Sequence, residues 1–465
     1  MLFSSITFLY YFLPLTLLVY YLVPAKAKNG ILFLASFFFY LWGEPKYSIL
    51  LLASVGTGYL GGRCIAYAGK KGRNCKKVVT GCFIAVTLSV LVFFKYTDFL
   101  IGSVNKATGI SLPLSGIVLP IGISFYSFQI ISYYVDVYCG EVETEKNILH
   151  FATYVTMFPQ LIAGPIVNYT EVSSCLKRRT VTARDFESGV RILVIGLGSK
   201  VIIADRVGML WNNVQTIGFN SISTPLAWLG AVAYSMELYF DFAGYSMMAV
   251  GLGKMLGFQI PVNFRFPYIS KSVTEFWRRW HITLGRWFRD YVYIPLGGSR
   301  KGRLRTMFNL FAVWTLTALW HGAGYNFLIW GGMLLGALFL EKLFLLPFLQ
   351  KSKVIGHVYL LLFVPVTWMA FTITDVHQLG IYLTRMFPFV NAHTGMVNSM
   401  DYIKYLKDYD SLLAMGVLFA TPVPAVIYGR IKRGLLGTLA VAVIFALSMY
   451  YLAVSANNPF LYFNF

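Results

Sequence analysis

Two histidines in apolar surroundings are the residues of this sequence best suited to acid–base chemistry. The chain carries six histidines: His150, His281, His321, His357, His377 and His393. His321 stands in Leu319-Trp-His-Gly322, between two apolar segments, and an ionisable group in such a place indicates function. A neutral imidazole suits general-base catalysis near pH 7. The alternative, a core histidine hydrogen-bonded between helices, stays open on these residues alone.

The second candidate, His281, lies in a stretch rich in tryptophan and arginine. If this stretch forms one helix, Trp277, His281 and Gly285 share a face. The functional interpretation is a cationic mouth that binds an anionic donor through Arg278, Arg279, Trp280 and Arg286, with the histidine near its throat. The alternative is an interfacial helix whose arginines bind anionic membrane lipid.

Three further features have weaker signals. Gly56-Thr-Gly-Tyr-Leu-Gly61 lies inside an apolar segment, where close helix packing explains it better than a dinucleotide site. Asp205 and Asp241 are acids in apolar segments. One interpretation is that they relay protons; the favoured one is a structural Asp205–Arg206 pair. The C-terminal segment 456–465 is an aromatic anchor at the outer interface, or it presents the Tyr462 phenol as an acyl-relay nucleophile.

The composition places these residues in a membrane protein. Hydrophobic residues make up 57% of the 465 residues and charged residues 12%, about half the ~25% of soluble domains. This excludes a water-soluble enzyme, a disordered chain and a nucleic-acid-binding domain. The five cysteines form no Cys-x-x-Cys motif and no cluster with histidine, so neither a disulfide framework nor a metal site is predicted.

The apolar segments predict an all-α, polytopic bundle of about 11–12 transmembrane helices, because about 20 apolar residues span a bilayer. No basic region precedes the first segment, which is therefore interpreted as a retained span. The predicted spans are 6–23, 31–42, 48–62, 78–94, 117–138, 188–210, 225–248, 306–320, 326–346, 354–374, 411–428 and 435–454.

The loop charges predict the orientation of this bundle. With the N-terminus outside, the inward segments carry 29 of the 39 Lys and Arg residues and the outward segments six. This asymmetry fits the positive-inside rule and places both termini outside the cell. Two inward stretches are unusually apolar: 148–168 is predicted to be re-entrant and broken by Pro159 and Pro165, and 258–305 to lie in the membrane interface.

In these segments the sequence resembles the membrane-bound O-acyltransferase (MBOAT) family. It is most similar to the bacterial branch that O-acetylates extracellular polysaccharides, with the D-alanyl transferases of teichoic acids as relatives. The resemblance covers nearly the whole chain as one membrane domain, 1–465. It rests on Phe158-Pro-Gln-Leu-Ile-Ala-Gly-Pro-Ile166, Glu237-Leu-Tyr-Phe-Asp-Phe-Ala-Gly-Tyr-Ser246, Phe276-Trp-Arg-Arg-Trp-His-Ile-Thr-Leu284, Tyr291-Val-Tyr-Ile-Pro-Leu-Gly-Gly298, Leu319-Trp-His-Gly322 and the aromatic tail.

The resemblance implies roles for the residues singled out above. His321 matches the family's catalytic histidine and His281 the second active-site histidine of this branch. The tail is similar to one that carries the acyl group outward, which would make Tyr462 catalytic. One departure is Gly244-Tyr-Ser-Met247, where related sequences commonly have an aspartate at the last position. Any role of that acid is therefore absent here or moved to Asp241.

These expectations combine into a membrane O-acyltransferase of the plasma membrane. It would take acetyl groups from acetyl-CoA or another cytosolic acyl thioester, hold no tightly bound cofactor and no metal, and O-acetylate an extracellular polysaccharide or cell-wall glycan. Its expected partner is an extracytoplasmic, esterase-like acetyltransferase of the SGNH type, and no nucleic acid is expected. The alternatives are a D-alanyl transferase fed by a carrier protein and a non-catalytic transporter or flippase.

Overall fold

The computed structural model describes residues 1–389, 397–454 and 461, and these residues form helices and connecting segments without a β-strand. The all-α prediction is confirmed. The chain divides into two compact units. Unit 1 consists of Met1–Leu193 and Tyr245–Val262, and unit 2 of Val194–Gly244 and Asn263–Phe465. The expectation of one membrane domain stays a prediction.

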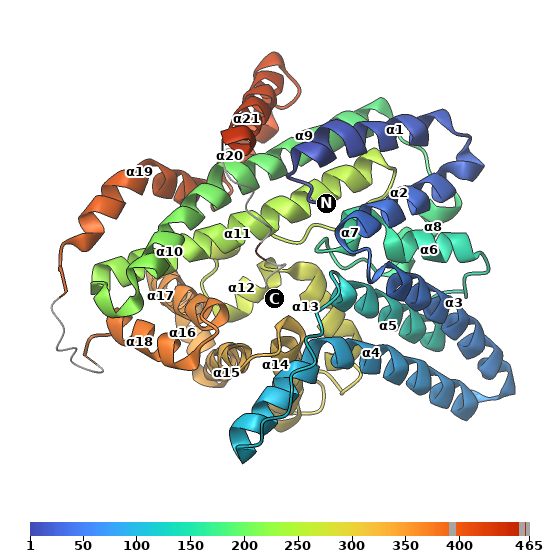
Figure 1. Cartoon of the computed structure of the whole chain (residues 1–465), viewed down its shortest axis with the longest axis horizontal. Coiled ribbons are helices and arrows are strands. Elements are labelled where there is room, and N and C mark those ends of the chain that lie inside the picture. The colour runs from blue at the N-terminus through green and yellow to red at the C-terminus, as the bar shows by residue number, and fades with distance from the viewer. Residues whose placement is uncertain (390–396, 455–460, 462–465) are drawn as a thin grey trace. The chain divides into compact units, whose positions relative to one another are not determined.

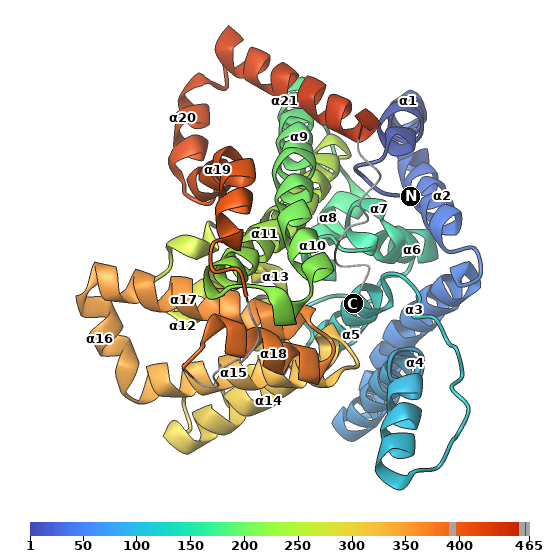
Figure 2. The same cartoon turned by 60° about the vertical axis from the view of Figure 1, so that its left-hand side comes forward.

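Unit 1 is built around α3, α4 and α5, which pack against one another (Figures 1 and 2). Its helices are η1 Phe8–Phe12, α1 Leu13–Leu22, η2 Ala25–Ala27, α2 Lys28–Gly43, α3 Ser48–Lys71, α4 Arg73–Thr108, α5 Ile123–Cys139, α6 Ile148–Thr156, α7 Phe158–Leu161, α8 Tyr169–Lys177 and most of α9 Ala183–Gly198.

Glycines of α3 allow this close packing. A Cβ atom at Gly58 would lie 2.7 Å from the Phe151 ring, and one at Gly61 would lie 2.6 Å from the Tyr134 ring. Neither position has room for a larger residue, although Gly56 has open space around it. The interpretation of this glycine segment as a packing surface is confirmed.

Unit 2 carries both candidate histidines, and in it α15 packs against both α14 and α17 (Figure 2). Its helices are η3 Ser199–Ala204, α10 Asp205–Ile217, η4 Phe219–Ser221, most of α11 Thr224–Met255, η5 Pro267–Ile269, α12 Val273–Arg279, α13 Ile282–Phe288, η6 Arg289–Tyr293, α14 Arg303–His321, α15 Tyr325–Leu340, η7 Glu341–Leu345, α16 Leu346–Lys351, α17 Lys353–Thr372, α18 Val376–Met386, α19 Asp401–Phe419, α20 Val423–Ile431 and α21 Leu435–Val454.

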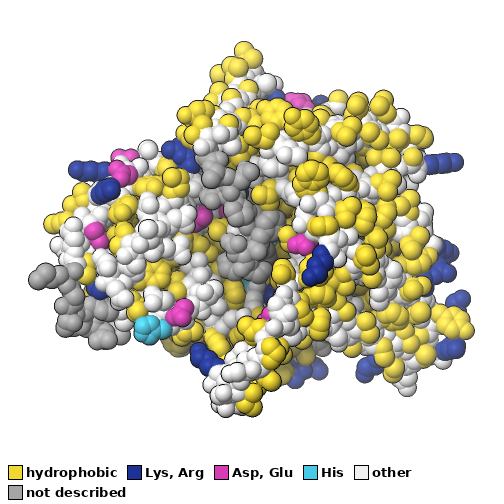
Figure 3. All heavy atoms as spheres, viewed as in Figure 1, with side chains coloured by type: hydrophobic (Ala, Val, Ile, Leu, Met, Phe, Trp, Pro, Cys, Tyr) yellow, Lys and Arg dark blue, Asp and Glu magenta, His cyan; other side chains and the backbone are white. Residues whose placement is uncertain are grey.

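Several helices are long and apolar enough to cross a membrane. Among the described residues five qualify by length and composition, and a sixth if the bent pair α19–α20 counts as one span. The five are Ser48–Lys71, Arg73–Thr108, Tyr325–Lys351, Val354–Thr372 and Leu435–Val454. Hydrophobic side chains also cover much of the face drawn in Figure 3. Exposed apolar surface of this extent is expected of a protein that lies in lipid.

Every predicted span overlaps a helix, but two predictions were wrong in detail. Residues 117–122, which include Pro120, are not helical, and α5 begins only at Ile123. The predicted span 411–428 is not one helix, because the chain bends by 73° between α19 and α20. Pro422 and Pro424 account for the bend, since proline removes a backbone donor and clashes with the preceding turn.

The segment 148–168 is broken as predicted. Helix α6 ends at Thr156, α7 is a single turn, and residues 162–168 are not helical. Pro159 lies in the first turn of α7, where proline is favoured, and the Phe158 amide donates to the Ser36 hydroxyl at 3.1 Å. The break therefore falls at Met157, just before Pro159. Re-entry into the membrane stays a prediction.

Candidate active site

His321 is the last residue of α14 and packs among aromatic side chains of unit 2. Its side chain is buried, and its ring centroid lies 4.9 Å from Trp330 of α15 and 5.4 Å from Phe371 of α17. Three helices thus position one imidazole. Burial among aromatic rings excludes water from this side chain, which strengthens its electrostatic interactions with a bound group.

The glycine after His321 makes this packing possible. A Cβ atom at Gly322 would lie only 2.0 Å from the ring of Phe327 in α15. Phe327 in turn contacts Phe371 at 5.2 Å between centroids. The Trp-His-Gly sequence therefore allows α14 to end directly against α15, with the histidine at the junction.

His281 joins two short helices, and this corrects the predicted single helix. Helix α12 ends at Arg279 and α13 begins at Ile282, so Trp277, His281 and Gly285 do not share one helix face. His281 itself has φ 44°. Only one other non-glycine residue in the described chain, Phe266, has a positive φ. A strained backbone of this kind costs about 1–3 kcal/mol and tends to occur at functional sites.

The side chain of His281 is buried and hydrogen-bonded on one side. Its Nδ1 lies 3.2 Å from Oδ1 of Asn263, and its ring packs edge-on against Phe242 at 4.8 Å. Burial lowers the pKa of His281, which lies outside the spanning helices, to about 3. The imidazole is therefore neutral at physiological pH and can act as a hydrogen-bond acceptor.

One indole contacts both candidate histidines. The ring of Trp320 lies 6.1 Å from the His281 ring and 5.0 Å from the His321 ring, centroid to centroid. The structure thus brings together two residues that are 40 positions apart in the sequence.

Tryptophans line the rest of this region. Trp330 is fully buried and contacts Trp277, Trp314 and Trp368 at 5.7–6.2 Å. The indole N–H groups of Trp277 and Trp330 have no hydrogen-bond partner among the described residues. A buried donor without a partner is costly, and it can donate to the carbonyl oxygen of a bound substrate.

The predicted donor-binding residues lie in different environments. Arg278 is exposed, Arg286 is partly exposed, and Arg279 forms a salt bridge with Glu275 at 2.8 Å. Trp280 is buried and stacks on Phe276 at 5.5 Å, so its visible role is packing. Donor binding by these residues stays a prediction.

A buried carboxylate positions α12. Glu341, in η7 after α15, is fully buried and accepts hydrogen bonds from the amides of Val273 (2.6 Å) and Thr274 (2.9 Å), and from the Thr274 hydroxyl. These N–H groups belong to the first turn of α12 and have no partner within the helix itself. A negative charge is favourable at this end of a helix. Glu341 was not predicted as a site residue. The sequence does carry a signal for it, because an acid stands within the apolar segment 326–346.

A buried charge cluster lies elsewhere in unit 2. Lys200, in the π-helical turn η3, forms salt bridges with Asp205 and, at 2.9 Å, with Asp241. The favoured Asp205–Arg206 pair is therefore wrong: Asp205 binds the lysine, and Arg206 donates to the Tyr451 hydroxyl at 2.7 Å. The contact between Lys200 and Asp241 was not predicted, because the two residues lie far apart in the sequence.

The C-terminal segment meets this cluster through one described residue. The amide of Leu461 donates to Oδ2 of Asp241 at 2.9 Å. The next residue, Tyr462, lies outside the described residues. The acid of the Glu237-Leu-Tyr-Phe-Asp241 motif therefore binds the backbone directly before the predicted relay tyrosine.

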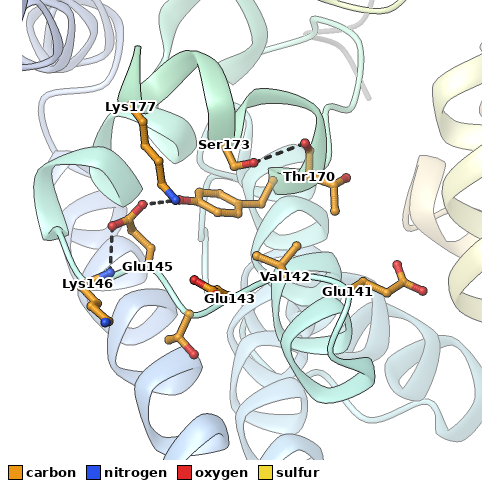
Figure 4. Close-up of a pocket in the computed structure, with 10 residues that line it drawn as sticks. Glu141, Val142, Glu143, Glu145, Lys146, Thr170, Ser173 and Lys177 are labelled. Atoms are coloured by element: carbon orange, nitrogen blue, oxygen red, sulfur yellow. Dashed lines mark hydrogen bonds between the residues drawn. The ribbon is translucent and has the colours of Figure 1, made fainter.

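A pocket of about 430 Å³ in unit 1 contains none of the predicted site residues (Figure 4). It is lined by acidic and basic side chains, among them Glu143, Glu145 and Lys177. Glu145 accepts hydrogen bonds from the Tyr169 hydroxyl and from the amides of Lys146 and Asn147. These contacts tie its carboxylate to the surrounding chain, which favours a structural role.

Fold and site together define a helical membrane protein with two buried histidines joined by an aromatic cluster. Residues 141–385 match the model of the membrane-bound O-acyltransferase family, MBOAT. A probable alginate O-acetylase of Pseudomonas putida is 36% identical over 100% of both chains. One from Pseudomonas syringae is 40% identical over 86% of this chain and 77% of its own. A peptidoglycan O-acetyltransferase of Helicobacter pylori is 36% identical over 71% and 68%.

The chain belongs to the MBOAT family. It is an integral membrane protein and an O-acyltransferase, as the sequence predicted.

Proposed function

We propose that this enzyme transfers acetyl groups from a cytosolic thioester across the plasma membrane for O-acetylation of an extracellular polysaccharide or cell-wall glycan. The observation that carries the proposal is the placement of His321 and His281, both buried, against one indole. The relatives named alginate and peptidoglycan acetylases support the substrate class.

The proposed chemistry uses His321 as the general base. His321 takes the proton of an acceptor hydroxyl while the hydroxyl oxygen attacks the thioester carbonyl carbon. The C–S bond then breaks, and the thiolate takes the proton and leaves as the free thiol. Buried indole N–H groups such as that of Trp330 stabilise the negative charge on the carbonyl oxygen. The enzyme needs no metal or tightly bound cofactor for these steps.

Moving only the acetyl group avoids carrying the charged donor through the bilayer, where each charge costs several kcal/mol. The donor, acetyl-CoA or another acyl thioester, enters from the side of the basic loops, which are also the surfaces that meet anionic lipid. In this orientation both termini are extracytoplasmic. The contact of Leu461 with Asp241 supports a tail that reaches into unit 2.

The acceptor hydroxyl in the proposed sequence is that of Tyr462. The resulting tyrosyl ester passes its acetyl group to a hydroxyl of the extracytoplasmic SGNH-type partner, and the phenol is regenerated. An aryl ester is more reactive than an alkyl ester, so the second transfer is favourable.

The test uses proteoliposomes with the purified enzyme and radiolabelled acetyl-CoA on one side only. We expect CoA release when the label is supplied on the side of the basic loops, and label retained on the protein when Tyr462 is present but not in Tyr462→Phe. Label that stays bound equally to Tyr462→Phe would exclude the relay. Turnover only with a D-alanyl carrier protein would support the alternative that the teichoic acid D-alanyltransferase relatives suggest, and translocation of intact donor would support a transporter.

A further inference from the structure

The carboxamide of Asn263 is the hydrogen-bonding centre of the bend that holds His281. Its Oδ1 accepts from the backbone N–H of Thr283 at 3.1 Å and from the Thr283 hydroxyl at 3.0 Å, and it lies 3.2 Å from Nδ1 of His281. All three side chains are buried. A backbone N–H can only donate, so the carboxamide atom that faces it is the oxygen.

This arrangement decides which imidazole nitrogen carries the hydrogen. A carboxamide oxygen can only accept, so the nitrogen that faces it must donate. His281 therefore carries its hydrogen on Nδ1, and Nε2 has a free lone pair. Nε2 is buried and has no hydrogen-bond partner among the described residues. Leaving a buried acceptor unsatisfied is unfavourable, and a substrate donor would satisfy it.

The backbone holds Asn263 in register with the bend. Its carbonyl oxygen accepts from the amide of Ile282 at 2.9 Å, and the amide of Arg265 donates to the carbonyl oxygen of Arg279 at 2.9 Å. The segment 263–265 is thus hydrogen-bonded to the chain on both sides of His281. The left-handed backbone of His281 places the imidazole against the carboxamide. This contact explains why a strained conformation occurs at this residue.

We propose that Asn263 is a positioning residue that locks His281 in the Nδ1–H tautomer, so that Nε2 accepts a hydrogen bond from an N–H or O–H group of the substrate. The proposal rests on the proposed acyl transfer for its kinetic consequence, whereas the tautomer itself is independent of any activity.

The direct test is ¹⁵N solid-state NMR of histidine-labelled full-length enzyme in lipid bilayers. The difference between wild type and His281→Ala identifies the two ring nitrogens of His281. We expect a protonated Nδ1 and an unprotonated Nε2 in the wild type, and a mixture or reversal of tautomers in Asn263→Ala. A hydrogen on Nε2 in the wild type, or an unchanged tautomer in Asn263→Ala, would overturn the proposal.

The kinetic test is a double-variant cycle. Asn263→Ala should lower kcat/KM by at least about tenfold, since in the wrong tautomer Nε2 of His281 carries the hydrogen and can no longer accept one from the substrate, and it should have no further effect in a His281→Ala background. Asn263→Asp retains the acceptor oxygen and should restore the Nδ1–H tautomer. Thr283→Val is the control, because it removes a donor to the same oxygen without freeing the imidazole.

If the losses of Asn263→Ala and His281→Ala multiply in the double variant, the two residues act independently. Asn263 would then act only on the fold, and the proposal would be overturned. If wild-type enzyme transfers no acyl group from any thioester, the proposed function fails, and the NMR measurement still decides the tautomer.

Discussion

The indole of Trp330 combines two features that suit catalysis: it packs on His321 at 4.9 Å, and its N–H has no partner among the described residues. Trp330→Phe keeps most of the ring but removes the donor. If this donor stabilises the oxyanion, kcat should fall about 100-fold. The measurement is the rate of CoA release under saturating donor.

Trp314→Phe is the matched control, because Trp314 belongs to the same cluster and contacts Trp330 at 6.0 Å. Equal rate losses in the two variants would assign Trp330 a packing role.

The low pKa of His281 has a consequence for stability. Burial holds this pKa at about 3 in the folded protein, whereas the unfolded value is about 6.5. Below pH 6.5 the unfolded chain binds a proton that the folded protein does not. Stability is therefore complete above pH 6.5 and falls as the pH decreases towards 3, by up to about 1.4 kcal/mol per pH unit.

His281→Asn tests this, because asparagine accepts the left-handed backbone and does not titrate. Thermal unfolding in detergent should lose less stability between pH 6.5 and 4.5 in the variant than in the wild type. Parallel curves would contradict neutral burial of His281.

At the scale of elements, α12 depends on a carboxylate from outside the helix. Glu341→Ala removes the acceptor of two backbone amides, so the free energy of unfolding should decrease by about 1–3 kcal/mol. Transfer activity should fall as well, because α12 leads into His281. Glu275→Ala is the control: it removes a partly exposed acid of the same helix and should cost about 1 kcal/mol or less. A Glu341→Ala protein as stable as the wild type would contradict this account.

The salt bridges of Lys200 connect η3 with α10 and α11. Lys200→Met leaves the buried Asp241 carboxylate and the partly exposed Asp205 carboxylate without their cation and should destabilise the protein by about 3–5 kcal/mol. Adding Asp205→Asn and Asp241→Asn should recover part of this loss. Unfolding temperatures of the single and triple variants provide the comparison; a triple variant less stable than Lys200→Met would contradict the pairing.

The sequence predicted the helices well because they have local signals, and local signals also singled out the candidate histidines, whose catalytic roles stay predictions. Apolar runs identify spans, and His321 is conspicuous between two of them. The bend at His281 had no local signal, since it depends on Asn263, which precedes it by 18 residues in the chain. Lys200 and Asp241 were equally hidden, because ion pairing between helices has no fixed spacing. The break in 411–428 had a signal in Pro422 and Pro424, but hydropathy outweighed it.

At the scale of the whole molecule, the asymmetry of basic residues predicts orientation. Cys139 is exposed and lies on the predicted inner side. It becomes a single labelling site in a variant whose other cysteines are replaced by serine. Thr108→Cys, at the exposed end of α4, lies on the predicted outer side. A membrane-impermeant maleimide should label Thr108→Cys in intact cells and Cys139 only after permeabilisation. The reverse pattern would contradict the orientation.

The central claim is that His321 acts as a base in acyl transfer. The most direct measurement is single-turnover transfer from labelled acetyl thioester in proteoliposomes, with wild type, His321→Ala and the control His357→Ala. His357 is a partly buried histidine that contacts the Ser270 carbonyl oxygen at 3.1 Å. We expect His321→Ala to lower the rate about 100- to 10,000-fold and His357→Ala to retain most of it. A His321→Ala enzyme that folds and transfers at the wild-type rate would contradict the account.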